Sequence, residues 1–254
     1  MPETFVTTFL LVLARLGGLV TAAPVLGHGL VPVRVKAGLA AVLAAALTPV
    51  VAPAVEPASV WSLAGMLAVE AASGVAIGMV AQFVLAGVQL GGQLAGIQMG
   101  FGIVNLIDPQ SHAQVSVIAQ WEQLLALLVF LVLDVHHLLL RALLGSFQVA
   151  PPGAVMMTGA SLRGVVAMAS DLFVVGIRVS APVLVALLLT NGALGVLART
   201  VPQLNVFVIG FPLNVGVGLI VLGASLPFTF RLLAARFAEL EPALSGFVRG
   251  LAHG

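Results

Sequence analysis

Two stretches of this 254-residue sequence contain no charged residue over a length greater than one membrane crossing requires. Residues 71–107 form an uncharged run of 37 residues, and residues 200–230 form one of 31. As straight helices these runs would measure about 55 Å and about 46 Å, whereas the hydrocarbon core of a bilayer is about 30 Å thick. Such runs predict helices that lie in an apolar environment and that are broken, folded back or covered by partners.

The composition of the whole chain supports this interpretation. Of all residues 61% are hydrophobic and only 7% are charged, against roughly 25% charged residues in an average soluble domain. The mean hydropathy is +1.19. A chain of this kind cannot cover a globular surface with polar groups. The sequence therefore predicts an all-α, polytopic integral membrane protein, with residues 1–254 forming one membrane domain in contact with lipid.

Charged residues and prolines divide the chain into about six apolar helical segments, namely residues 4–26, 37–55, 61–104, 115–140, 165–197 and 200–230. The sixth contains Gly210, Phe211 and Pro212, and we expect a helix break there because proline removes a donor and clashes with the preceding turn. The third is too long for a simple span. It fits a broken helix or hairpin, and equally two spans joined by a tight apolar turn.

Several classes of function lack the residues that they need. The chain has no cysteine, and its net charge of +1 offers no basic surface for nucleic acid. His136 and His137 are adjacent and would point about 100° apart on a helix, so we do not expect both to bind one metal. Asp134 and His136 could act as base and orienting group, but a nucleophile is missing. We predict no catalytic, cofactor-binding or metal-binding residue and no enzymatic activity.

One face of the third segment carries amide and small side chains. Gln82, Gln89 and Gln93 are spaced by seven and four residues, and Gly96 and Gly100 continue the same helical face. Glycine ladders let helix backbones approach closely, and amide side chains can form hydrogen bonds across the contact. The face fits packing against other subunits or the lining of a polar conduit, and it also fits ordinary packing within one chain.

Six charged residues lie inside the apolar segments: Arg15, Glu70, Glu122, Asp134, Asp171 and Arg178. Charges within spans are costly and are usually functional or paired. We expect Glu70 and Glu122 to form structural ion pairs near helix ends. Asp171 and Arg178 are seven residues apart, about 10 Å along a helix axis, so we expect each of them to pair with a neighbouring helix.

Three motifs occur in an order and spacing that is similar to a known family. The first is GGQLAGIQMGFGIVNLIDP at residues 91–109, and the second combines HHLLL at 136–140 with SF at 146–147 and PPG at 151–153. The most specific is RTVPQLNVFVIGFPL at residues 199–213. Together they resemble the flagellar branch of the FliR/SctT family of type III secretion export-gate proteins. Residues 191–195 read NGALG where the family more often has NPALG.

The resemblance implies a core subunit of the flagellar type III protein export gate, in the bacterial inner membrane and associated with the flagellar basal body. It implies one copy of this chain in a hetero-oligomer with several FliP-type and FliQ-type subunits, next to an FlhB-type protein. Residues of about 1–165 would be FliP-like, and about 166–254 would form a FliQ-like helical hairpin. Unfolded flagellar polypeptides would pass through the conduit, and the chain itself would bind no cofactor.

Family members also supply a plug-like loop that helps to close the conduit. By position, this loop would comprise Leu106, Ile107, Asp108, Pro109 and Gln110, and the apolar residues around Ile107 would seal it by dewetting. From the residues alone, the same segment fits either an exposed connector or a loop in a pore. The alternative function is that of a stand-alone secondary transporter, although the sequence shows no convincing internal repeat and only one clear helix break.

Overall fold

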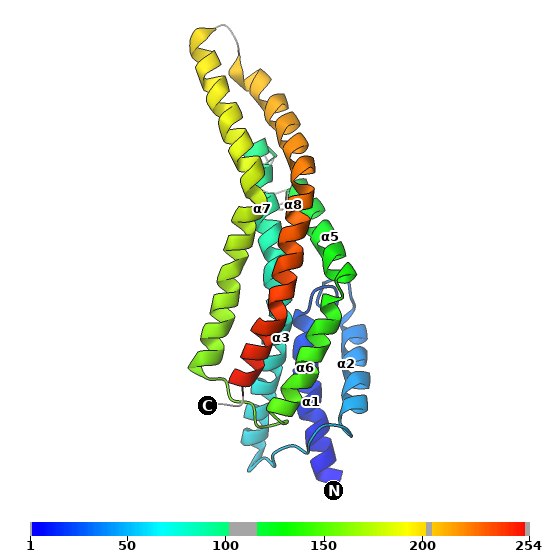
Figure 1. The fold of residues 1–254 in the computed structure, drawn as a ribbon. Coiled ribbons are helices and arrows are strands. Elements are labelled where there is room, and N and C mark those ends of the chain that lie inside the picture. The colour runs from blue at the N-terminus through cyan, green and yellow to red at the C-terminus, as the bar shows by residue number, and fades with distance from the viewer. Residues whose placement is uncertain (1, 102–115, 202–204, 252–254) are drawn as a thin grey trace. The chain divides into compact units, whose positions relative to one another are not determined.

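The computed structural model describes residues 2–101, 116–201 and 205–251, and these ranges contain helices and no strand. The helices are α1 (Pro2–Ala22), α2 (Val33–Leu47), α3 (Val60–Met99), α5 (Val117–Val132), α6 (Val135–Val149), α7 (Gly159–Thr200) and α8 (Val206–Gly250) (Figure 1). The prediction of an all-α fold is confirmed.

In the described part of the chain, four helices are long and apolar enough to cross a membrane, namely α1, α3, α7 and α8. The pair α5 and α6 would add a fifth crossing if the two count as one broken span. α2 has only 15 residues, fewer than the roughly 20 that a crossing needs. Each of the six predicted apolar segments thus contains a helix in its described part, but these helices do not make six simple crossings.

The third segment forms neither a hairpin nor two spans, and both predictions for it are wrong. α3 is a single helix of 40 residues from Val60 to Met99. The sequence contains no proline between Pro57 and Pro109, so no residue in this stretch lacks a backbone donor. Its glycines other than Gly65 lie against neighbouring helices, and this packing offsets their low helix propensity.

The predicted helix break at Gly210, Phe211 and Pro212 is also wrong. α8 runs from Val206 to Gly250 and includes all three residues. Pro212 lies in the second turn, where its missing N–H leaves one carbonyl group, that of Val208, without its helical donor. Losing one hydrogen bond there disturbs the backbone less than unwinding a helix whose side chains are apolar.

The chain divides into two compact units, and each is described by itself. Unit 1 comprises residues 1–83, 130–170 and 236–254, and unit 2 comprises residues 84–129 and 171–235. In unit 1, α1 packs against α2, and the buried side chains of α1 include Leu11, Leu16 and Leu19. The helices α3, α7 and α8 each contribute residues to both units. The expected division into a FliP-like part of about residues 1–165 and a FliQ-like part of about residues 166–254 stays a prediction.

Unit 2 is built from residues 171–200 of α7, residues 206–235 of α8, residues 84–99 of α3 and most of α5. One cluster in its buried core consists of Ala95, Met99, Ile118, Val183, Leu187 and Leu222. Asn214 Nδ2 donates a hydrogen bond to Asn191 Oδ1 over 3.0 Å, which joins α8 to α7 near their connection. These two helices thus run antiparallel within unit 2.

Candidate functional site

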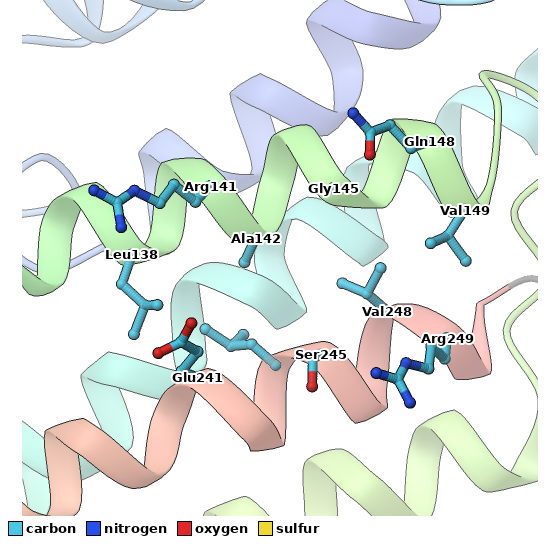
Figure 2. A pocket seen from close by; sticks show the side chains of 11 residues that line it. Leu138, Arg141, Ala142, Gly145, Gln148, Val149, Glu241, Ser245, Val248 and Arg249 are labelled. Atoms are coloured by element: carbon cyan, nitrogen blue, oxygen red, sulfur yellow. The ribbon is translucent and has the colours of Figure 1, made fainter.

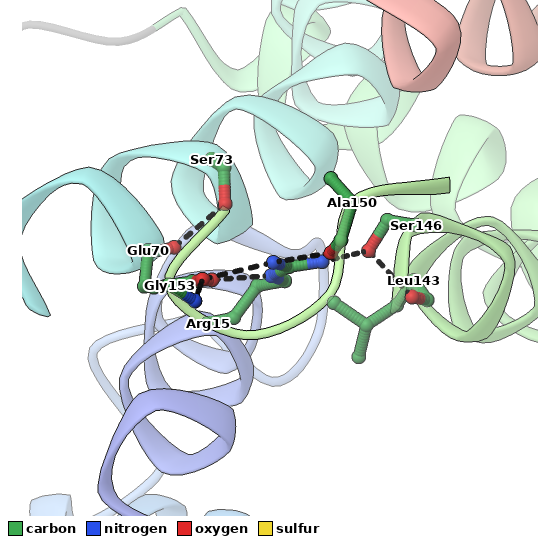
Figure 3. Close-up of polar contacts among 7 residues, drawn as sticks. All are labelled: Arg15, Glu70, Ser73, Leu143, Ser146, Ala150 and Gly153. Carbon is green, nitrogen blue, oxygen red and sulfur yellow. Dashed lines mark hydrogen bonds and ion pairs between the residues drawn. The ribbon is translucent and has the colours of Figure 1, made fainter. Parts of the chain in front are cut away.

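A buried ion pair joins α1 to α3 in unit 1. Arg15 Nε lies 2.5 Å from Glu70 Oε2, and Arg15 Nη2 lies 3.0 Å from Glu70 Oε1, so the ion pair is bidentate (Figure 3). The two side chains are 0% and 1% exposed. Removing either partner would leave the other charge buried and uncompensated.

The remaining donors of Arg15 bind α6 and the segment after it. Nη1 donates a hydrogen bond to Ser146 Oγ over 2.8 Å, and Nη2 donates one to the carbonyl oxygen of Ala150 over 3.0 Å. The guanidinium carbon lies 4.2 Å from the centroid of the Phe147 ring, within the range of a cation–π contact. One side chain therefore ties together α1, α3 and the end of α6.

Glu70 has a second partner that depends on a glycine. The N–H of Gly153 donates a hydrogen bond to Glu70 Oε1 over 2.8 Å. Gly153 has a φ of +86°, a conformation that L side chains rarely adopt, so the turn that presents this N–H needs glycine. The PPG motif at residues 151–153 thus supplies a hydrogen-bond donor for the carboxylate of Glu70, which lies 83 residues earlier.

The crossing of α1 and α3 beside this ion pair is made close by glycines. A Cβ at Gly74 would collide with the carbonyl oxygen of Arg15, and one at Gly18 would collide with the carbonyl oxygen of Ala71. At Gly78, a Cβ would lie 2.9 Å from the backbone nitrogen of Ala23. The two backbones meet without side chains between them, which places Arg15 and Glu70 within reach of each other.

In unit 2, glycines of α3 serve two further helices. A Cβ at Gly87 would lie 2.8 Å from the carbonyl oxygen of Leu172, and one at Gly91 would lie 2.9 Å from that of Gly176, both on α7. A Cβ at Gly92 would lie 2.6 Å from Cα of Ala119 on α5. The helix therefore presents small residues to α7 on one side and to α5 on another.

Four of the five residues that we placed on one face lie in α3, and their surroundings differ. Gly96 packs against Ser116, and Gln93 Oε1 accepts a hydrogen bond from the N–H of Ser116 over 3.0 Å. Gln89 is half-buried in unit 2, whereas Gln82 is exposed in unit 1. Lining of a conduit by this face stays a prediction.

Gly100 does not continue that face, because α3 ends at Met99. Gly100 has a φ of +101°, and the N–H of Phe101 donates a hydrogen bond to the carbonyl oxygen of Gly96 over 2.9 Å. This is a helix-ending arrangement in which glycine adopts the left-handed conformation. Gly100 thus stops the helix and is not a packing residue within it.

Three other charged residues within apolar segments form no ion pair among the described residues. Glu122 makes no ion pair among the described residues, and its Oε2 is buried without a hydrogen-bond partner there. Asp171 and Arg178 are exposed on α7, and the described part of the chain offers neither of them an ion pair. The predicted ion pair of Glu122 is therefore wrong among the described residues. The pairing of Asp171 and Arg178 with a neighbouring helix stays a prediction.

A groove of about 280 Å³ lies between α6 and the end of α8 in unit 1 (Figure 2). Its lining combines an apolar floor that includes Leu244 and Val248 with the charged side chains of Arg141, Glu241 and Arg249. Sequence reasoning missed this groove because its two walls are about 100 residues apart.

The predicted plug residues Leu106, Ile107, Asp108, Pro109 and Gln110 lie outside the described residues.

Comparison with known proteins identifies the family. The sequence pattern of the family described as "Bacterial export proteins, family 1" matches residues 6–240, which include most of both compact units. The chain belongs to this family. The resemblance that the motifs indicated is thereby confirmed.

Relatives within family 1 are similar over nearly their whole length. The chain is 31% identical to the flagellar biosynthetic protein FliR of Escherichia coli over 239 residues, which are 94% of this chain and 92% of that protein. It is 36% identical to FliR of Bacillus subtilis over 220 residues, 84% of each chain. It is 26% identical to FliR of Aquifex aeolicus over 248 residues, 97% of this chain and 96% of that one.

Proposed function

We propose that this chain is a core subunit of the flagellar type III protein export gate, located in the bacterial inner membrane at the flagellar basal body. It helps to form and close the conduit through which unfolded flagellar subunits pass during flagellum assembly. The observation that carries the proposal is the match to export proteins over nearly the full chain, with relatives named flagellar biosynthetic protein FliR. The proposed role is structural and involves no catalytic residue.

An assembly role is supported by the apolar surface of unit 2. Many large apolar side chains of its hairpin are exposed, among them Phe173, Ile177, Leu188 and Leu189 on α7 and Val208, Phe211, Ile220, Phe228 and Phe230 on α8. Of the most apolar window of α8, only 17% is buried within the chain. Large exposed apolar surfaces mark places that lipid or another protein covers.

Two charged residues in the same part of α7 favour protein as the cover. Asp171 and Arg178 are exposed on α7, close to Phe173 and Ile177 in sequence. A charge in contact with hydrocarbon is costly, whereas a partner subunit can supply an opposite charge or a hydrogen bond. We therefore assign this face to FliP-type and FliQ-type subunits, and we place an FlhB-type protein next to the C-terminal part of the chain.

Single cysteines on α7 test this assignment, because the natural sequence contains none. Leu188 is 67% exposed and its neighbour Leu187 is 0% exposed. In cells that export flagellar proteins, Leu188→Cys should cross-link to a cysteine introduced into a FliP-type or FliQ-type subunit. Leu187→Cys is the matched control and should give no cross-link, because its side chain lies in the core of unit 2. Equal cross-linking at both positions, or none at Leu188, would contradict the assignment.

The closing role rests on the resemblance and concerns the loop that contains Ile107. Deleting residues 106–114 should leave the complex assembled while raising the leakage of small molecules through the membrane, because an apolar constriction is lost. Leakage is measured in cells that lack the external filament, alongside the amount of assembled complex. An assembled gate with unchanged leakage would show that this loop is not the plug.

A further inference from the structure

Asp134 lies between α5 and α6 in a backbone conformation that few non-glycine residues adopt. Its φ is +54°, in the left-handed region that Asp and Asn tolerate better than most side chains. It is the N-cap residue of α6, where an Asp carboxylate usually accepts hydrogen bonds from first-turn N–H groups. The Asp134 side chain makes no such bond, so its carboxylate is available to another partner.

Two imidazole rings face this carboxylate. Asp134 Oδ1 lies 3.2 Å from His137 Nδ1 and 3.8 Å from His136 Nε2. The two ring centroids are 4.2 Å apart, and the three potential ligand atoms all lie within 4.8 Å of one another. Our expectation that the rings of His136 and His137 point apart is therefore wrong. Both residues lie in the first turn of α6, and both rings are directed toward Asp134, which precedes this helix.

We propose that Asp134, His136 and His137 bind one divalent transition-metal ion of the zinc type. Zinc–nitrogen and zinc–oxygen bonds of about 2.0–2.2 Å place the ligand atoms of a tetrahedral site roughly 3.3 Å apart. The 3.2 Å separation of Asp134 Oδ1 from His137 Nδ1 matches this value, and the 3.8 Å separation from His136 Nε2 is slightly longer. All three residues come from one short stretch of unit 1. Rotation of the His137 ring, whose side chain is 57% exposed, brings the third pair of atoms together.

The ligand atoms select the class of ion. The nitrogen of His136 that is directed toward Asp134 is Nε2. The other ring nitrogen, Nδ1, is buried without a hydrogen-bond partner among the described residues. Two imidazole nitrogens and one carboxylate suit Zn²⁺, Co²⁺, Ni²⁺ or Fe²⁺, whereas Mg²⁺ and Ca²⁺ prefer oxygen ligands. With three protein ligands, the ion would keep a position open for water. The bound ion would hold Asp134 against the first turn of α6.

The test titrates the full-length chain in detergent with Co²⁺ after treatment with a chelator, using a purification tag that contains no histidine. We expect one Co²⁺ per chain, a visible absorption spectrum of nitrogen and oxygen coordination, and displacement by Zn²⁺, which binds such sites more tightly. A large excess of Mg²⁺ should leave the spectrum unchanged.

Three variants decide whether these residues are the ligands. Asp134→Asn preserves the size of the side chain, and asparagine tolerates the left-handed conformation. Asp134→Asn and His137→Gln, each made singly, should weaken Zn²⁺ binding by about tenfold or more. His28→Gln makes the same change at an exposed histidine outside the cluster and should bind as the unaltered chain does. Circular dichroism checks that each variant is equally helical. Absence of Co²⁺ binding, or equal binding by all three variants, would show a hydrogen-bonded cluster only and would overturn the proposal.

Discussion

Replacing Arg15 by methionine should destabilise the chain by about 3–5 kcal/mol, because it leaves the Glu70 carboxylate buried without its partner. The substitution also removes the hydrogen bonds to Ser146 and Ala150, so the end of α6 loses its link to α1. The measurement is the denaturant midpoint of the purified chain in detergent, followed by circular dichroism. In cells, we expect the amount of assembled export complex to fall in parallel.

Two controls separate the buried charge from a general effect of losing an arginine. Arg236→Met breaks a pair with Glu239, whose side chain is 63% exposed, and should change stability by less than about 1 kcal/mol. Arg15→Met combined with Glu70→Leu should recover much of the loss, since no charge stays buried. A single Arg15 variant as stable as the Arg236 variant would contradict the importance that we give to this ion pair.

Introducing a methyl group at Gly74 should destabilise the chain by about 1–3 kcal/mol or more. The Cβ of Gly74→Ala would collide with the carbonyl oxygen of Arg15, and a backbone atom cannot rotate away as a side chain can. The helices α1 and α3 would have to separate, and Arg15 would be drawn away from Glu70. The denaturant midpoint in detergent measures the loss.

Gly17 provides the matched control on α1. A Cβ at Gly17 would meet nothing within 4 Å, so Gly17→Ala should be neutral or should stabilise the helix by up to about 1 kcal/mol. The two substitutions add the same methyl group and raise helix propensity alike, so they differ only in the space that they meet. If both variants unfold at the same denaturant concentration, the close crossing of α1 and α3 is not important for stability.

The fold class could be predicted because it depends on where charge is absent. The uncharged runs at residues 71–107 and 200–230 indicated long helices, and α3 and α8 are such helices. The continuity of these helices could not be predicted in the same way. Pro212 is tolerated in the second turn of α8, and the glycines of α3 other than Gly65 are held by packing against α1, α5 and α7.

The candidate site was predicted only in part, because its groups are far apart along the chain. Arg15 and Glu70 each stood out as charges in apolar segments, but 55 residues separate them and no periodicity relates them. Gly153 and Ser146 carried no signal for a role beside a charge. The metal cluster was missed for another reason, since its geometry depends on the left-handed conformation of Asp134, which helical periodicity does not describe.

The native mass of the 25.9 kDa chain in mild detergent, alone and together with FliP-type and FliQ-type subunits, tests the central claim most directly. A gate subunit should join a hetero-oligomer that contains one copy of this chain, and its exposed α7–α8 hairpin should then be protected. A stable particle of this chain alone, unchanged when those subunits are present, would contradict the gate assignment and would favour a stand-alone transporter.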